Sequence, residues 1–173
     1  MQSPTLSTAR LTLRLPTTDD LGAYTAFNAV SDTTIGTYRG GKSAAETRAV
    51  LDGDIAHWDK GFGMWLLRDR KGVVVGGAGL VIPKGWENHE LTWWLMPDQR
   101  RLGYATEASR AVISFGYDTL NWPQVETMMR DENAPARHLA LRLGGKITRR
   151  QTFPDGVARD VYALPRQPAE APA

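Results

Sequence analysis

The amino-acid sequence predicts an α+β (mixed α/β) fold, with a central, mostly antiparallel twisted sheet of about seven strands flanked by four helices. Short segments that alternate apolar and polar residues, a pattern typical of strands, recur along the chain. Segments with apolar residues at helical spacing interrupt this series after the first, fourth and fifth strands. Antiparallel strands in series with inserted helices indicate a mixed sheet that is covered on both sides.

The first half of the chain is expected to contain one strand, two helices and then a strand hairpin. Residues 1–8 are expected to be a loose terminus. Thr17-Thr18 precedes two aspartates, which favours a helix start. Ser43-x-x-Glu46 is a capping box that opens the second helix. The strands expected in this half are residues 10–15, 64–68 and 73–82.

The second half continues with a strand over residues 90–95 and then alternates helices with strands. Pro97 ends that strand, and a helical pattern follows from Ala108 to Leu120. Pro135 suits the first turn of a fourth helix, which Gly144-Gly145 ends. The remaining strands are expected at residues 124–130, 146–152 and 157–164.

The composition is that of a single globular domain without disulfides. The 173 residues are 42% hydrophobic and 23% charged, which is ordinary for a soluble protein able to bury its own core. No apolar run approaches the ~20 residues that span a bilayer. The N-terminus lacks the layout of a secretory signal, and cysteine is absent. We therefore expect a cytoplasmic location, one domain over residues 1–165, and a disordered tail over residues 166–173.

Charge and histidine content argue against several kinds of partner. The net charge of +2 is too small to indicate nucleic-acid binding, which requires a concentrated basic face. No membrane partner is expected either. The three histidines are scattered: His89 is expected in a turn, and His57 and His138 are expected in helices, packed or solvated. Without cysteines, such a set does not indicate a metal site.

The most informative segment joins the strand 90–95 to the following helix. It reads Arg-Arg-Leu-Gly-Tyr-Ala over residues 100–105. A loop between a strand end and a helix start presents free backbone N–H groups and the positive end of the helix dipole, which favours phosphate. Gly103 lets the backbone approach a phosphate without a β-carbon in the way. A second basic pair, Arg137 and Arg142, also fits a polyanionic cofactor.

These residues resemble a known family. Arg100-x-x-Gly103-x-Ala105 is similar to the (Gln/Arg)-x-x-Gly-x-(Gly/Ala) signature of the GCN5-related N-acetyltransferases (GNAT family), which bind acetyl-coenzyme A. Tyr-Ala-Thr-Glu-Ala at 104–108, after Glu-Leu-Thr-Trp-Trp-Leu, looks most like the ribosomal-protein-alanine acetyltransferase (RimJ/RimL) branch. A second motif, from Asn133 to Gly144, resembles the pattern of the family's fourth helix. The resemblance covers roughly residues 10–164 and implies the acyl-CoA N-acyltransferase (GNAT) fold.

The resemblance also implies how acetyl-CoA is held. Backbone N–H groups of residues 101–106 would bind the pyrophosphate, with the guanidinium of Arg100 or Arg101 assisting. The pantetheine arm would pair with the strand near residues 94–96, where a backbone N–H would polarise the thioester carbonyl. Asn133 would contact the cofactor. The expected cofactor-binding residues are Trp94, Leu95, Met96, Arg100, Arg101, Leu102, Gly103, Tyr104, Ala105, Thr106, Asn133 and Arg137.

Acetyl transfer to an amine requires a group that removes the proton of the amine. Glu90, at the start of the strand 90–95, is the candidate general base, because a partly buried carboxylate can have its pKa raised toward neutrality. The alternative is that Glu90 supports the sheet. Many family members use a tyrosine of the fourth helix as the general acid, but Ala140 and Leu141 occupy that region here. Another group, water, or unassisted departure of the thiolate would then serve.

The expected function is transfer of an acetyl group from acetyl-CoA to a primary amine, on a protein N-terminus or a small molecule, in a ternary complex. Substrate selection is expected in the loops 31–41 and 83–88, with Thr37, Tyr38, Arg39 and Trp86 as candidates. A homodimer is compatible with the sequence. The alternatives are a non-catalytic acyl-CoA-binding module and a nucleotide-binding protein. Against the latter, no Gly-Lys-Ser/Thr follows the loop.

Overall fold

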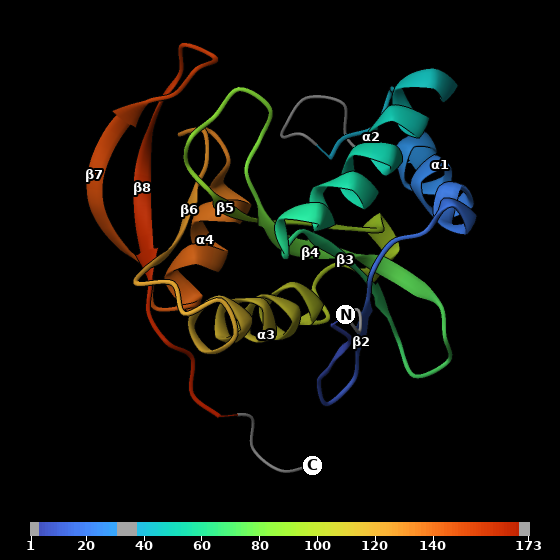
Figure 1. The fold of residues 1–173 in the computed structure, drawn as a ribbon, viewed down its shortest axis with the longest axis horizontal. Helices are drawn as coiled ribbons and strands as arrows, with labels where there is room; N and C mark the ends of the chain where they lie inside the picture. The colour runs from blue at the N-terminus through green and yellow to red at the C-terminus, as the bar shows by residue number, and fades with distance from the viewer. Residues whose placement is uncertain (1–3, 31–37, 170–173) are drawn as a thin grey trace.

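The computed structural model describes residues 4–30 and 38–169, which fold into two antiparallel sheets and four α-helices (Figure 1). The strands are β1 (Leu6–Ser7), β2 (Thr12–Arg14), β3 (Met64–Arg68), β4 (Val74–Val81), β5 (Glu90–Leu95), β6 (Val125–Met128), β7 (Lys146–Thr152) and β8 (Ala158–Leu164). The helices are α1 (Leu21–Val30), α2 (Ala44–His57), α3 (Tyr104–Asp118) and α4 (Ala134–Arg142), with short 3-10 turns at Thr18–Asp20, Trp58–Lys60 and Pro97–Gln99.

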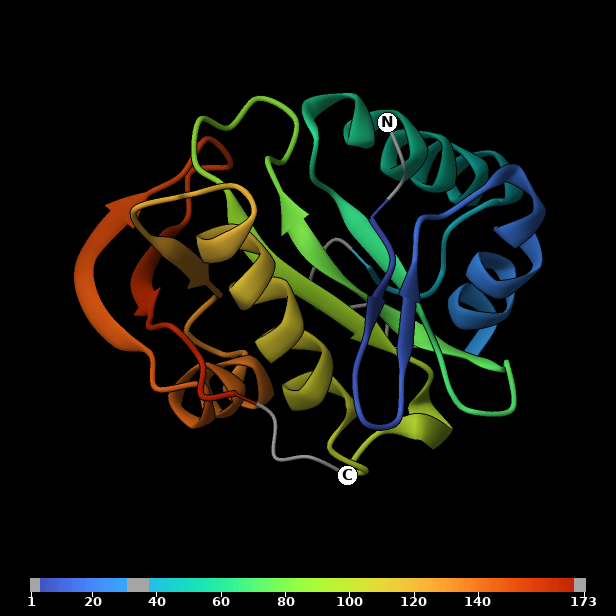
Figure 2. The ribbon, with the colours of Figure 1, turned by 60° about the horizontal axis from the view of Figure 1, so that its bottom comes forward.

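The larger sheet has the strand order β1-β2-β3-β4-β5 and is buried on both faces. Side chains of β3 alternate between these faces. Trp65 and Leu67 pack in the core under α3, whereas Met64 and Leu66 pack with residues of α1 and α2. A strand covered on both sides has no polar face, which explains the unbroken apolar run at residues 64–67. Figure 2 shows α3 lying across the face opposite α1 and α2.

The smaller sheet has the order β6-β8-β7 and lies beside the open edge of β5. Two side-chain hydrogen bonds join β5 to β6 near their starts. Thr127 Oγ1 donates to Leu91 O at 2.8 Å, and Glu126 N donates to His89 Nε2 at 3.1 Å. No strand ladder connects the two sheets in the described residues. The edges of β5 and β6 are therefore held together at one end.

One glycine of β4 makes room for a large side chain of the neighbouring strand. Gly77 pairs with Trp94 of β5, and a β-carbon at residue 77 would come within 2.4 Å of Trp94 Nε1. The indole of Trp94 thus lies over the backbone of β4 and packs in the core beneath α1, next to Tyr24 and Phe27. The packing of Trp94 therefore requires glycine at residue 77.

The predicted fold class and most predicted elements are confirmed. The capping box at Ser43 forms, since Ser43 Oγ accepts from Glu46 N at 3.1 Å. Two predictions were wrong. The strands form two sheets rather than one, and Leu6–Ser7, within the terminus expected to be loose, pairs with β2. A hydrogen bond from Thr8 N to Leu11 O at 2.9 Å closes the turn between these strands.

Residues 165–169 carry no helix or strand, although Gln167 Nε2 donates to Leu143 O at 3.0 Å. The rest of the tail expected to be disordered, residues 170–173, lies outside the described residues. Among the helices that the structure describes, none is long and apolar enough to cross a membrane.

Candidate active site

A cleft of about 1810 Å³ runs along the facing edges of β5 and β6. Its walls include residues 90–95 of β5 and residues 127–129 at the end of β6. One end, which we call the helix end, is lined by the first turns of α3 and α4. The other end, which we call the hairpin end, is lined by Tyr38, Arg39, Trp86, Glu90, Arg130, Asp155 and Arg159.

The loop before α3 presents a row of backbone N–H groups to the helix end. Arg101 and Gly103 have positive φ angles of 64° and 83°. The first bond of the helix runs from Glu107 N to Gly103 O at 3.0 Å. Within the described chain, the N–H groups of residues 101–106 donate no backbone hydrogen bond. This arrangement, at the positive end of the helix dipole, suits a phosphate group.

Glu107 fixes this loop to the N-terminal hairpin. Its carboxylate accepts from Arg10 Nε at 2.8 Å, from Arg10 N at 2.9 Å and from Thr8 Oγ1 at 2.5 Å. Arg10 Nη1 also donates to Leu102 O at 2.8 Å. Burial acts to raise the pKa of Glu107, but the hydrogen bonds from Thr8 and Arg10 outweigh it and lower the pKa. Figure 2 shows the β1–β2 hairpin beside the start of α3. Glu107 therefore does more than stabilise the helix dipole.

The open edge of β5 offers N–H groups to the cleft, and one of them, that of Leu95, lies within the range 94–96 where pairing was predicted. Met96 N donates to Val75 O of β4 at 2.9 Å, so this N–H is used within the larger sheet. Because the hydrogen-bonding direction alternates along a strand, the N–H groups of Trp93 and Leu95 point to the cleft. Met96 does not line the cleft, whereas Trp93, which was not predicted, does.

Glu90 lies in the cleft at the start of β5, as the sequence indicated. Burial raises the pKa of its carboxyl to about 7; the charge of Arg159 opposes this rise and that of Asp155 adds to it. No hydrogen bond to its carboxylate is formed by the residues described in the structure. A carboxyl group with this pKa changes protonation state near neutral pH, as a general base must.

An arginine–aspartate pair forms the opposite wall of the hairpin end. Arg159 Nη1 and Nη2 donate to the two carboxylate oxygens of Asp155 at 2.9 and 2.7 Å. The guanidinium lies 5.3 Å from the Trp86 ring, which stacks on Phe153 at 4.6 Å. The hydrogen bonds from Arg159 hold the pKa of Asp155 at about 2. Arg130 lies 3.8 Å from Asp155.

Tyr38 closes the hairpin end from the side of α1 and α2. Its hydroxyl donates to Asp54 Oδ1, and the Tyr24 hydroxyl donates to Asp54 Oδ2, each at 2.7 Å. Burial raises the pKa of Asp54 to about 6, against the effect of these two hydrogen bonds. Thr37, predicted from the same loop, lies outside the described residues.

Helix α4 contributes Asn133 and His138 to the helix end. Asn133 is the N-cap, since its Oδ1 accepts from Ala136 N at 3.3 Å. The residues at the position of the missing tyrosine cannot act as a general acid. Ala140 is fully buried, Leu141 is 55% exposed, and both side chains are apolar. His138 is exposed in its helix, as one of the two expectations had it, and it also lines the cleft.

Most of the predicted site residues converge on this cleft, but some do not. The predicted residues that line it are Tyr38, Arg39, Trp86, Glu90, Trp94, Leu95, Arg100, Arg101, Gly103, Ala105, Thr106 and Asn133. Besides Met96, the side chains of Leu102, Tyr104 and Arg137 lie elsewhere. Leu102 is 49% exposed, Tyr104 lies beneath the Arg10 guanidinium, and Arg137 donates to Asp131 O.

Comparison with known proteins identifies the family. The profile of the Acetyltransferase (GNAT) domain matches residues 10–146, and the chain therefore belongs to the GNAT acetyltransferase family. The crystal structure of an acetyltransferase from Agrobacterium tumefaciens strain C58 is 29% identical, with 95% of each chain covered and a TM-score of 0.83.

Two further proteins are similar to this chain. RimJ of Mycobacterium smegmatis, in complex with CoA-disulfide, is 16% identical, with 94% of this chain and 87% of that chain covered and a TM-score of 0.74. The uncharacterised N-acetyltransferase YnaD of Bacillus subtilis (strain 168) is 28% identical over 60 residues. That match spans 35% of this chain and 35% of YnaD.

Proposed function

We propose that the protein transfers an acetyl group from acetyl-CoA to a primary amine, and that the cleft along β5 and β6 binds both substrates. The observation that carries this proposal is the row of N–H groups at residues 101–106, which donate no backbone hydrogen bond in the described chain. They fit a pyrophosphate, and Arg100 and Arg101 beside them supply positive charge. Acetyl-CoA would supply the acetyl group as a thioester.

The strand β5 would orient the thioester. The N–H groups of Trp93 and Leu95, directed to the cleft, would hydrogen-bond the pantetheine arm and polarise the carbonyl. Asn133, through its placement at the start of α4, and the rigid loop fixed by Glu107 would hold the other parts of the same molecule. The facing edge of β6, held to β5 by Thr127, would form the second wall.

Glu90 would accept the proton of the amine, directly or through water. An ammonium group has no lone pair, so it must lose a proton before it attacks. A carboxylate whose pKa is raised to about 7 is a stronger base than an ordinary glutamate and is ionised above neutral pH. The leaving thiolate needs less help, because thiols have a pKa of about 8.5. We therefore assign no general acid on α4.

The RimJ/RimL-like branch is part of the proposal. Its support is the Tyr-Ala-Thr-Glu-Ala segment at 104–108, together with the fold shared with M. smegmatis RimJ in complex with CoA-disulfide. The acceptor that we propose is a primary amine, either on a protein N-terminus or on a small molecule.

The experiment that tests the function is measurement of free CoA thiol with time, with acetyl-CoA and a panel of primary amines, and mass spectrometry of the products. We expect CoA release that depends on the amine, together with an N-acetylated product. Tight acetyl-CoA binding without turnover on any amine would instead identify a non-catalytic acyl-CoA-binding module.

A further inference from the structure

We propose that the acceptor is a primary amine that also carries a carboxylate, and that Arg130 binds this carboxylate while the amine faces Glu90. This inference rests on the proposed function, because it names the class of acceptor for the same cleft. It is carried by the charged side chains at the hairpin end and by the way they are paired.

Among the described residues, the charged groups of the hairpin end leave one guanidinium for the acceptor. The guanidinium groups of Arg130 and Arg159 line this end, against the two carboxyl groups of Glu90 and Asp155. Arg39 lines it too, but its charge is not counted because it is engaged in an interaction of its own. Because Asp155 is paired with Arg159 and Glu90 would face the amine, the charge of Arg130 remains to attract an anionic group on the acceptor.

The negative charge of Asp155 is already compensated by its hydrogen-bond donors. Besides both donors of Arg159, its Oδ1 accepts from Val157 N at 3.1 Å, and Arg130 lies near Oδ2. The low pKa of about 2 reflects these interactions. Asp155 therefore offers little to a second ammonium group, and an acceptor with several positive charges would meet the arginines instead.

Arg159 and Arg130 differ in how far their donors are engaged. The side chain of Arg159 is 9% exposed, with its guanidinium bound to Asp155 and Val157 O and placed over the Trp86 ring. We interpret Arg159 as a structural residue that stabilises this wall of the cleft. The side chain of Arg130 is 44% exposed, and within residues 4–30 and 38–169 its guanidinium has one ion pair, the 3.8 Å contact with Asp155.

Arg130 thus has donors available in the fork geometry that suits a carboxylate. It follows β6, on the wall of the cleft that faces β5, and Glu90 begins β5. An amine and a carboxylate of one small acceptor would therefore face opposite walls. The carboxylate can belong to a free amino acid or to an acidic residue near the N-terminus of a peptide.

The test is kcat/KM, measured by CoA release at saturating acetyl-CoA, for acceptors matched in size. Phenylalanine is compared with phenethylamine, and the peptide Asp-Ala-Ala-amide with Asn-Ala-Ala-amide; spermidine is the polycationic acceptor. We expect the carboxylate-bearing member of at least one pair to be preferred by about 10- to 100-fold, the range of a charge-assisted hydrogen bond. The pair that discriminates identifies the source of the carboxylate.

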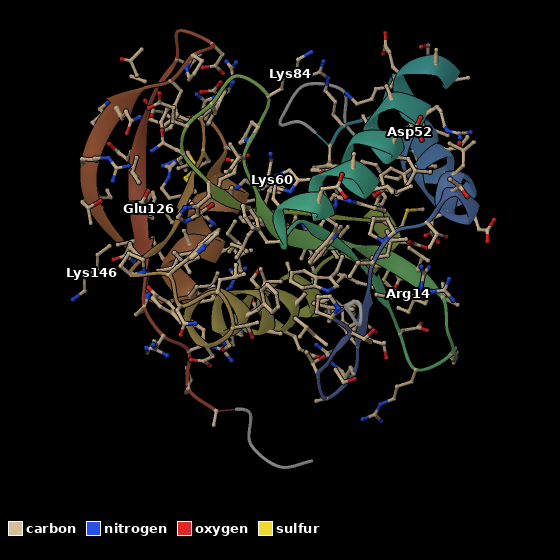
Figure 3. All side chains as sticks on the ribbon, viewed as in Figure 1. Arg14, Asp52, Lys60, Lys84, Glu126 and Lys146 are labelled. Carbon is tan, nitrogen blue, oxygen red and sulfur yellow. The ribbon has the colours of Figure 1, made fainter. Side chains whose placement is uncertain are left out.

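Arg130→Gln should lower kcat/KM for the carboxylate-bearing acceptor much more than for phenethylamine and so remove that preference, whereas Arg130→Lys should keep part of it. Arg149→Gln is the matched control, because Arg149 pairs with Glu126 in the smaller sheet, outside the cleft (Glu126 is labelled in Figure 3). Equal loss on all acceptors, or preference for phenethylamine or spermidine, would overturn the acceptor assignment alone. No CoA release with any amine would overturn the proposed function as well.

Discussion

Replacing Glu90 by glutamine distinguishes a general base from a structural carboxylate. Because burial raises the pKa of Glu90 to about 7, about a tenth of the carboxyl groups are ionised at pH 6 and most are ionised at pH 8. If the ionised form takes the proton, the glutamine variant should lose about 10²- to 10⁴-fold in kcat/KM above neutral pH. The ratio of wild-type to variant kcat/KM should fall about tenfold between pH 8 and pH 6. The ionisation of the amine itself cancels in this ratio.

The same substitution has a predicted effect on stability. Between the ordinary pKa of 4.5 and about 7, the unfolded chain loses the Glu90 proton while the folded protein keeps it. The free energy of unfolding therefore falls as the pH rises through this window, by about 3 kcal/mol in total. Glu90→Gln should remove this fall, so its stability relative to wild type should rise from pH 4.5 to pH 8 in urea titrations.

The control is Glu126→Gln, whose carboxylate pairs with Arg149 outside the cleft. The kinetic and stability results separate two explanations. A stability difference that varies with pH, together with a rate ratio that does not, would refute the general-base role and leave Glu90 as a support of the sheet. A constant stability difference would refute the raised pKa itself.

Three further substitutions test the framework of the cleft. Gly103→Ala places a β-carbon on a residue with φ 83°, 3.2 Å from an Arg10 nitrogen. It should lower the free energy of unfolding by about 1–2 kcal/mol and weaken acetyl-CoA binding in calorimetry. Unchanged affinity would exclude the loop as the phosphate site. Thr127→Val removes the bond to Leu91 O and should lower the free energy of unfolding by about 1–3 kcal/mol, measured in urea; an unchanged value would show that this bond does not help hold β6 to β5. Asp54→Ala leaves two tyrosine hydroxyls without their acceptor and should lower the free energy of unfolding by about 2–4 kcal/mol in the same assay. A loss below about 1 kcal/mol would mean that water replaces the carboxylate as the acceptor.

The sequence was sufficient for features that depend on local chemistry. Alternation over five or more residues, the capping box at Ser43 and the glycine stop at 144–145 are each encoded within a few positions. The strand Leu6–Ser7 is too short to show alternation, so it was missed. Much of the helix end of the cleft could be predicted as well, because the strand–loop–helix segment around Gly103 is also encoded within a few positions.

Features that depend on pairing between distant segments could not be predicted in this way. Pairing of the pantetheine arm was expected near residues 94–96. The pairing of β5 with β4 leaves the N–H groups of residues 93 and 95 at the open edge, and a shift of one residue reverses the direction of every N–H. The contacts of Arg10 with Glu107, and of Arg130 with Asp155, join positions far apart in the chain. Composition and spacing carry no signal for either contact.

The most direct test of the central claim is a calorimetric titration of the purified protein with acetyl-CoA, with ATP titrated in parallel. The two ligands share an adenine nucleotide but differ in the pantetheine arm and the thioester. The cleft along β5 and β6 predicts micromolar binding of acetyl-CoA and much weaker binding of ATP. Equal binding of both, or no binding of acetyl-CoA, would contradict the assignment of this cleft as an acetyl-CoA site.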